Sequence, residues 1–477
     1  MKIRPFAFGM LLIFLISISA CASTPSPDSA GGADSIEKTA KNSKEPEKIE
    51  PPKTPDVIFV EKLQSALAKG DLEGAIGHFE TIPEELKDNS DMKILQASLL
   101  LSANRTKEAA VIASELKSKD PSNKEVLELN AQIALASGDS QAQNAAIKQL
   151  LAADPNNAAA NIILGDQQQI KKKYKLALNN YRRALISEPD NHDALYGYGK
   201  MCWYTGDMKS AKETFNKMYQ MDKNDTVALS YLGKLSAEDE NYKNAIDYIE
   251  KAIKLEPNTY DFFLDYGSYL RNVGRYADAE KAWSKAIQID PTYFLGYAYR
   301  AGLYDEQDKF KQALADYHMV VKTNPSYYFA YEEIGILEFH EKNWAVARAA
   351  FSKANSIKSQ SAYQLMIMAT YIKENNLFEA KKMAQNIMKN MNRESLDYKM
   401  IRLYHDQGPA NAENTIATAL DKETDKTKRG KMLFYFALYY QMRGSDAVAK
   451  EYYSKVTKMQ TPLFFEYRLA EWAEQEL

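Results

Sequence analysis

Histidine and serine are the residues of this chain whose side chains most often do chemistry, and their spacing predicts no catalytic or metal site. No histidine has a second histidine three to five residues away, as a helical zinc site requires. The histidines are His78, His192, His318, His340 and His405. Residues 114–117 match the S-x-x-K pattern of one class of serine enzymes, but its companion S-D-N and K-T-G elements are missing. We therefore expect no enzyme, no metal, no cofactor and no small-molecule substrate.

The chain has two cysteines, Cys21 and Cys202, so no internal disulfide can form if Cys21 is modified. Cys202 stands on the apolar stripe of a predicted helix, which leaves two interpretations open: a small buried side chain or a reactive thiol. The formal net charge is −3, and it becomes −5 (−3 − 2) once the basic residues Lys2 and Arg4 are removed with a leader. An acidic balance of this kind argues against a general nucleic-acid partner.

The first twenty residues are a predicted secretory signal. Two basic residues precede an apolar run over residues 6–18, which is too short to span a bilayer and ends in small residues. Residues 18–21, ISAC, resemble the lipobox of bacterial lipoproteins. The resemblance implies that Cys21 is acylated, by palmitate or a similar chain, and that Ala22 directs the protein to the outer membrane. We expect a lipid-anchored protein of the bacterial cell envelope, on its periplasmic or its surface face.

Prolines and small residues recur with a period of 34 residues. The prolines on this grid are Pro121, Pro155, Pro189, Pro257, Pro291 and Pro325. A column of small residues runs through Ala75, Ala109, Ala177, Ala211, Ala245, Ala279, Ala313 and Ala347, and a bulky column through Phe79, Tyr181, Phe215, Ile249, Trp283, Tyr317 and Phe351. These columns resemble the tetratricopeptide repeat family, whose unit is a pair of antiparallel helices. The resemblance implies an all-α fold, a right-handed α-solenoid of stacked antiparallel helix pairs.

One period shows why helices must pair and stack. In residues 260–293, Phe263, Tyr266, Gly267 and Leu270 follow the spacing of one helical stripe, and Gly274 ends that helix. A second stripe follows, and Pro291 stops it. A single pair cannot bury both stripes, so neighbouring pairs must stack.

The period divides the chain into segments. We expect a signal peptide over 1–20, a lipidated cysteine and disordered linker over 21–55, and a regular array over 56–361, with pairs starting near 56, 90, 124, 158, 192, 226, 260, 294 and 328. Beyond residue 359 the phase slips by about one residue. Degenerate repeats are predicted over 362–462 and a solvated capping helix over 463–477, which carries apolar and acidic residues.

The face of each first helix next to its packed stripe becomes the concave wall when pairs stack. The resemblance implies that proteins or peptides bind there. Candidate residues of this wall are Tyr196, Lys200, Trp203, Tyr231, Lys234, Leu264, Ser268 and Arg271. Lys200 and Lys234 hold equivalent positions one repeat apart and would suit an extended segment with carboxylates, whereas Asp305, Glu306, Glu332 and Glu333 predict an acidic stretch further along. The alternative is that these residues form an ordinary solvated helix face that binds no partner.

Three functions fit these expectations. The first is a membrane-anchored, non-enzymatic scaffold for protein–protein interactions in the cell envelope, of the kind that assists secretion, pilus or outer-membrane assembly. The second is a surface-exposed adhesin that binds host or neighbouring-cell molecules. The third is a peptidoglycan-associated enzyme or regulatory subunit.

Overall fold

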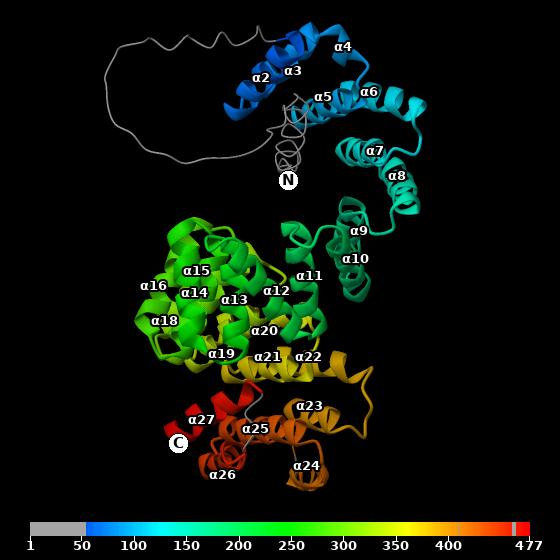
Figure 1. Cartoon of the computed structure of the whole chain (residues 1–477). Coiled ribbons are helices and arrows are strands. Elements are labelled where there is room, and N and C mark those ends of the chain that lie inside the picture. Colours follow the sequence, from blue (N-terminus) through cyan, green and yellow to red (C-terminus); the bar gives the residue numbers. More distant parts are fainter. Residues whose placement is uncertain (1–53, 409, 460–463) are drawn as a thin grey trace, which may run out of the picture. The chain divides into compact units, whose positions relative to one another are not determined.

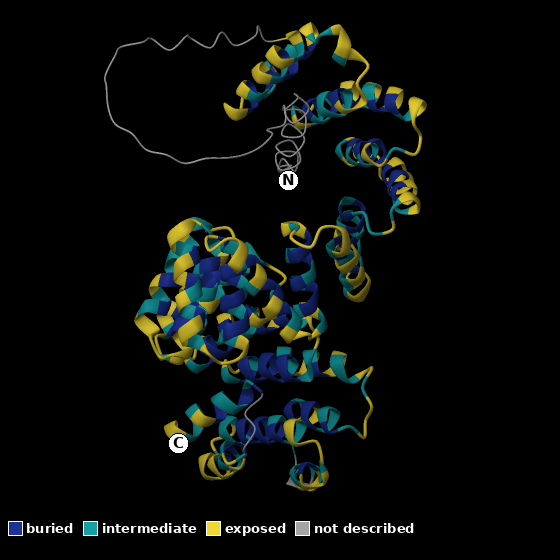
Figure 2. Ribbon diagram, viewed as in Figure 1, coloured by how far each residue is buried: buried dark blue, intermediate teal, exposed yellow. Residues whose placement is uncertain are grey.

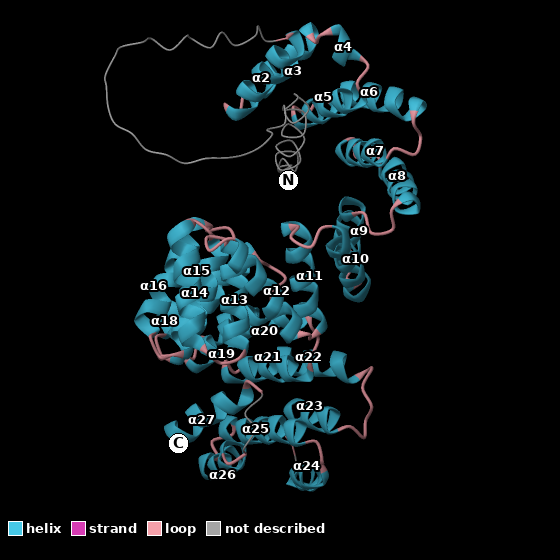
Figure 3. Cartoon of the chain, viewed as in Figure 1, coloured by secondary structure: helices cyan, strands magenta, loops and turns pink. Residues whose placement is uncertain are grey.

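The structure of the protein, a computed structural model, describes residues 54–408, 410–459 and 464–477. Over these residues it is built of helices and contains no strand (Figure 3). The predicted signal peptide, Cys21 and nearly all of the predicted linker lie outside the described residues. The chain divides into two compact units, residues 1–221 and 222–477, which we call the N-terminal unit and the C-terminal unit.

The helices of each unit follow one another as packed pairs (Figure 1). In the N-terminal unit they are α2 (Pro55–Ala68), α3 (Leu72–His78), the 3-10 turn η2 (Phe79–Thr81), α4 (Glu84–Lys87), α5 (Ser90–Ser102), α6 (Thr106–Lys119), α7 (Lys124–Ala136), α8 (Ser140–Ala153), α9 (Ala158–Ile170), α10 (Tyr174–Ser187), α11 (His192–Thr205) and α12 (Met208–Met221).

In the C-terminal unit the helices are α13 (Thr226–Glu238), α14 (Tyr242–Leu255), α15 (Tyr260–Asn272), α16 (Tyr276–Ile289), α17 (Leu295–Glu306), α18 (Phe310–Thr323), α19 (Tyr328–His340), α20 (Trp344–Ile357), α21 (Ser361–Lys373), α22 (Leu377–Met388), α23 (Leu396–Asp406), α24 (Ala410–Lys422), α25 (Lys426–Met442), α26 (Asp446–Thr457) and α27 (Glu466–Glu476). First helices begin within a residue of every predicted start, and the predicted all-α stack of helix pairs is confirmed.

A residue in the left-handed backbone conformation makes the turn inside each pair. These residues are Gly70, Asn104, Gly138, Lys172, Gly206, Glu240, Gly274, Asp308 and Lys342, one every 34 residues. The chain then folds back on the first helix, as where the Arg275 N–H donates to the Leu270 carbonyl at 2.9 Å. The next left-handed residue is Asn375, only 33 residues after Lys342 (375 − 342), which confirms the predicted phase slip.

Proline and asparagine set the boundary between pairs. Asp290, the residue before Pro291, has an extended backbone (φ −136°, ψ 93°), because the proline ring disfavours helical geometry in the preceding residue. The following first helix is often capped by a side chain, as where the Asn191 amide oxygen accepts the Ala194 N–H at 3.0 Å.

Each pair is held together by close approach of its two backbones. A Cβ added to Gly267 of α15 would lie 2.4 Å from the indole nitrogen of Trp283 in α16, and the equivalent Gly335 would meet the ring of Phe351 at 2.8 Å. The buried residues accordingly line the helix faces that meet their neighbours (Figure 2). Gly233 differs, because its partner on the bulky column is Ile249 and the nearest atom to an added Cβ is a carbonyl oxygen at 3.4 Å.

We predict that Gly267→Ala lowers the free energy of unfolding by about 1–3 kcal/mol, because the new methyl group overlaps the Trp283 ring. Gly233→Ala is the matched control: it has room for the methyl group and gains helix propensity, so it should be neutral or stabilising by up to about 1 kcal/mol. Urea unfolding of the two variants measures the difference. Equal effects would contradict the packing argument.

Candidate functional site

The candidate residues of the N-terminal unit gather on one face of α11. Tyr196, Lys200 and Trp203 are spaced four and three residues apart, so they share a face, and each is half-buried. The Lys200 ammonium donates to the Tyr196 hydroxyl at 3.3 Å and lies 5.3 Å from the centre of that ring. Trp203 packs on Tyr204 at 5.8 Å between ring centres. The three side chains thus form a cationic and aromatic surface.

No carboxylate pairs with Lys200 within the part of the chain that the structure describes. The equivalent residue one repeat earlier is Asp166, whose carboxylate accepts the Tyr181 hydroxyl at 2.6 Å. Burial raises the pKa of Asp166, and the charge of Lys200 opposes that rise. The ammonium is therefore close to a negative charge but is not neutralised by an ion pair, and a partner carboxylate can still approach it.

The candidate residues of the C-terminal unit are largely occupied by contacts within the chain. The Lys234 ammonium of α13 lies 2.8 Å from the Asp265 carboxylate of α15, and burial raises the pKa of Asp265 against the pull of that ammonium. Arg271 forms an ion pair with Glu306 of α17. Tyr231 is half-buried on α13. Lys234 and Arg271 are therefore bridges between neighbouring first helices.

Leu264 does not belong to an exposed wall, and its prediction as a partner-binding residue is wrong. It is buried and packs with Leu270 and Trp283 in the core between α15 and α16. Its carbonyl accepts the Trp283 indole N–H at 3.1 Å and the Ser268 hydroxyl at 2.9 Å. The prediction rested on the position of Leu264 around its helix, which does not reveal that α15 is covered by both α16 and α17 at this point.

The last helix, α27, covers the first-helix face that the sequence predicts to be an acidic wall. Arg468 of α27 makes a two-pronged ion pair with Asp305 of α17, at 2.6 and 2.8 Å. Trp472 stacks on His340 of α19 with 4.1 Å between ring centres and meets Phe310 at 5.5 Å. The predicted C-terminal helix thus forms over Glu466–Glu476 and keeps Glu471 and Glu476 exposed, while its other face packs into the C-terminal unit.

Carboxyl groups are buried beneath α27. Glu466 is fully buried, with one oxygen 2.9 Å from the Tyr435 hydroxyl of α25, and burial raises its pKa to about 7. Burial, together with Asp305 and Glu332, raises the pKa of Glu333 to about 8, although Arg468 opposes the shift. Asp305 and Glu333 thus face α27, whereas Glu306 is exposed and paired with Arg271, so the predicted acidic stretch does not form one continuous wall.

Sequence reasoning placed Trp472 among the apolar residues of the terminal helix but missed Arg468 and Glu466 as structural residues. The signal that could have found them is local: Glu466, Leu469, Ala470 and Ala473 share one face of α27, and a carboxyl group on an otherwise apolar face needs a partner. The partners lie far away in sequence, Tyr435 for Glu466 and Asp305 for Arg468, the latter 163 positions away, and no local pattern contains them.

Cys202 is a buried core residue. Its side chain is fully buried, and burial raises the pKa of the thiol to about 11. A thiol with so high a pKa stays protonated at neutral pH and is a poor nucleophile. The buried interpretation is confirmed.

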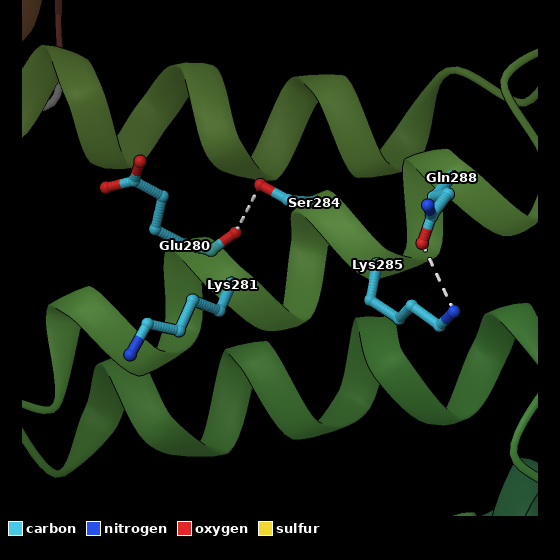
Figure 4. Close-up of a pocket in the computed structure, with 5 residues that line it drawn as sticks. All are labelled: Glu280, Lys281, Ser284, Lys285 and Gln288. Atoms are coloured by element: carbon cyan, nitrogen blue, oxygen red, sulfur yellow. Dashed lines mark hydrogen bonds between the residues drawn. The ribbon is translucent and has the colours of Figure 1, made fainter.

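No group of three histidine, cysteine, aspartate or glutamate side chains is arranged to hold a metal ion in the residues that the structure describes. A shallow depression of about 470 Å³ lies along α16, lined by Glu280, Lys281, Ser284, Lys285 and Gln288 (Figure 4). Its polar groups already have partners. Glu280 accepts the Tyr304 hydroxyl at 2.8 Å, and Lys285 donates to Gln288 at 3.2 Å.

Three stretches of the chain, residues 172–226, 232–294 and 300–362, match the tetratricopeptide repeat family. Each stretch contains helix pairs with the 34-residue spacing and left-handed turn described above. This part of the chain therefore consists of tetratricopeptide repeats.

The curated relatives share only a segment with this chain. Human serine/threonine-protein phosphatase 5 is 32% identical over 115 residues, which is 24% of this chain and 22% of that protein. The UDP-N-acetylglucosamine--peptide N-acetylglucosaminyltransferase of Giardia intestinalis is 27% identical over 117 residues, 24% of this chain and 8% of that protein. The chain thus spans less than a quarter of the length of these relatives.

Similar solved structures are also repeat proteins. A tetratricopeptide repeat protein from Parabacteroides merdae is 22% identical, with 52% of this chain and 98% of that chain covered and a TM-score of 0.41. PilW, a type IV pilus biogenesis factor, is 16% identical, with 43% and 96% covered and a TM-score of 0.37. TM-scores this low do not establish a shared overall arrangement. No helix among the described residues has the length and apolar character needed to cross a membrane.

We predict that raising the pH destabilises the C-terminal unit through Glu333. Its pKa is 4.5 when unfolded and about 8 when folded, so its stabilising contribution is complete below pH 4.5 and is lost as the pH rises through 8. Between pH 5 and 8 the free energy of unfolding should fall by on the order of 2 kcal/mol.

Glu333→Gln should flatten this slope, because the amide cannot ionise. The exposed Glu341→Gln at the end of the same helix is the control and should leave the slope as it is. Urea unfolding at a series of pH values measures both, and an unchanged slope in Glu333→Gln would refute the buried cluster as its cause.

Proposed function

We propose that this protein is a membrane-anchored, non-enzymatic scaffold that gathers other proteins in the bacterial cell envelope. The tetratricopeptide repeats supply a row of first helices, and tethering rests on the lipobox-like sequence that ends at Cys21. The process served is an assembly or secretion task at a membrane, with the outer membrane as the expected location.

The face of α11 is the observation that carries the proposal. Tyr196, Lys200 and Trp203 present an ammonium and aromatic surface that remains partly accessible in the N-terminal unit. Tryptophan and tyrosine are enriched in protein-binding hot spots, and the Lys200 ammonium adds a site for a partner carboxylate. A partner segment with a carboxylate and apolar side chains fits this chemistry.

The helix stack makes the surface rigid before a partner arrives. The backbone of α11 is fixed by Gly197, whose added Cβ would lie 2.3 Å from the Tyr181 ring, and by Gly199 against Phe215. Because the surface is already ordered, binding does not have to supply that ordering energy. This favours recognition of an extended or helical segment by a preformed face.

Cys21→Ser tests the anchor. A serine at this position cannot form the thioether that holds the lipid, so we expect the variant to leave the membrane fraction and to incorporate no labelled palmitate. Fractionation of cells that express either form measures this. Retention of the variant in the membrane fraction would contradict lipid anchoring at Cys21.

Lys200→Glu with Trp203→Ala tests the binding face. We expect capture of envelope proteins from a bacterial extract to weaken by about tenfold, because the charge reverses and the aromatic surface is lost. Lys254→Glu, an exposed substitution on α14, is the control and should capture as the unchanged protein does. Lys234 is unsuitable, since a glutamate there would face the carboxylate of Asp265 and disturb folding.

Capture that persists unchanged in the double variant, with folding intact by circular dichroism, would show that α11 is an ordinary solvated face. Failure of the binding-face test would not affect the result of the Cys21→Ser test, so the two halves of the proposal are tested separately.

A further inference from the structure

The turn between α9 and α10 carries a concentration of positive charge that the repeat does not require. Lys171, Lys172, Lys173 and Lys175 are all exposed. No ion pair joins any of them to a carboxylate within the described part of the chain. From residue 167 to residue 187 the sequence has six basic residues and no acidic one, in a chain whose net charge is −3.

Neighbouring repeats show that these lysines are not needed to make the turn. The corresponding turn before α8 reads Ser137–Gly138–Asp139, and the one before α12 reads Thr205–Gly206–Asp207. Lys172 takes the left-handed conformation that glycine takes in both (φ 57°). The turn needs a left-handed residue but no charge, so the lysines are free to serve another purpose.

Apolar side chains flank the lysines and are also exposed. Ile170, at the end of α9, is 81% exposed, and Leu176, in the first turn of α10, is 52% exposed. Tyr204, one repeat after Ile170, is 51% exposed and stacks on Tyr174 at 5.0 Å between ring centres. We call these lysines, together with Ile170, Leu176 and Tyr204, the lysine turn.

Backbone hydrogen bonds hold the lysine turn in place. Backbone N–H groups of Lys172 and Lys173 donate to the carbonyls of Gln169 and Gln168 at 2.9 and 2.8 Å, which fixes the turn against the end of α9. A depression of about 530 Å³ lies between residues 172–176 and the end of α11 at Tyr204 and Thr205. The nearest acidic side chain in the next turn, Asp207, is engaged as a helix cap and accepts the Ser210 N–H at 3.1 Å.

We infer that the lysine turn docks on the surface of an anionic phospholipid membrane. Clustered ammonium groups attract lipid phosphates, and each contributes about 1 kcal/mol near an anionic surface. Exposed Ile, Leu and Tyr side chains beside them can enter the interfacial layer, where apolar and amphipathic groups are favoured. A bilayer surface accommodates both kinds of group at once, whereas a purely acidic peptide such as polyglutamate would use the ammonium groups and leave Ile170 and Leu176 in water.

This docking is a second membrane contact that does not depend on Cys21. If the proposed anchor is also correct, the tether raises the local concentration of the lysine turn at the bilayer and orients the N-terminal unit. The test below removes Cys21, so a wrong anchor cannot affect its result.

The experiment is co-sedimentation of the chain lacking residues 1–21 with vesicles of phosphatidylglycerol and phosphatidylcholine, or of phosphatidylcholine alone. We expect binding to the anionic vesicles only, weakening as salt is added. The triple variant Lys172→Glu, Lys173→Glu, Lys175→Glu should bind about a hundredfold more weakly. Ile170→Ser with Leu176→Ser, which leaves the charge unchanged, should weaken binding about tenfold.

The matched control reverses three other exposed lysines, Lys243, Lys254 and Lys311, and changes the net charge by the same amount. It should bind vesicles like the unchanged chain. Equal loss in the control, equal binding to both kinds of vesicle, or undiminished binding of the lysine-turn triple would each overturn the proposal. Binding to polyglutamate is measured for the same variants. If the lysine-turn triple loses the polyglutamate binding of the unchanged chain but still binds vesicles, the lysine turn is assigned to an acidic protein partner instead.

Discussion

The close approach of a first-helix glycine to an aromatic ring on the second helix is the constraint on which the repeats depend. At Gly165, Gly267 and Gly335 even a methyl group would overlap the facing ring, so the ring can be large only because the glycine has no side chain. The contact differs where the ring is replaced by Ile249: the atom nearest to a Cβ added at Gly233 is a carbonyl oxygen at 3.4 Å. The close spacing of the two helices in these pairs follows from this contact.

The sequence predicts what repeats and fails on what does not. Helix starts, left-handed turns and the one-residue slip after Lys342 all follow from a period that is visible in the residues. Of the predicted wall, Tyr196, Lys200 and Trp203 lie together, but Leu264 is buried and Lys234 is bound to Asp265. Periodicity gives the position of a residue around its helix, whereas its availability depends on which neighbours reach it. The role of α27 was unpredictable because its contacts join distant repeats.

Charge within the two units serves different purposes. In the C-terminal unit the acidic side chains near α27 have partners within the protein. Arg468 faces Asp305 and Glu333, and the Tyr435 hydroxyl donates to Glu466. In the N-terminal unit Lys200 and the lysine turn remain accessible. The accessible basic and aromatic residues of both proposed surfaces therefore lie between α9 and α11, although the chain as a whole is acidic. Net charge alone conceals this distribution.

The bridge between Arg468 and Asp305 joins residues 163 positions apart, and like the contact of Trp472 with His340 it stands out in an architecture whose contacts mostly connect neighbouring repeats. Most helix pairs find their packing partners in the next pair, but Asp305 of α17 and Glu333 of α19 meet the Arg468 guanidinium only once α27 (Glu466–Glu476) has formed. A chain interrupted near its end would leave them facing water. Docking of α27 is therefore expected to be a late step in the folding of the C-terminal unit, because its contacts join residues that are far apart in sequence.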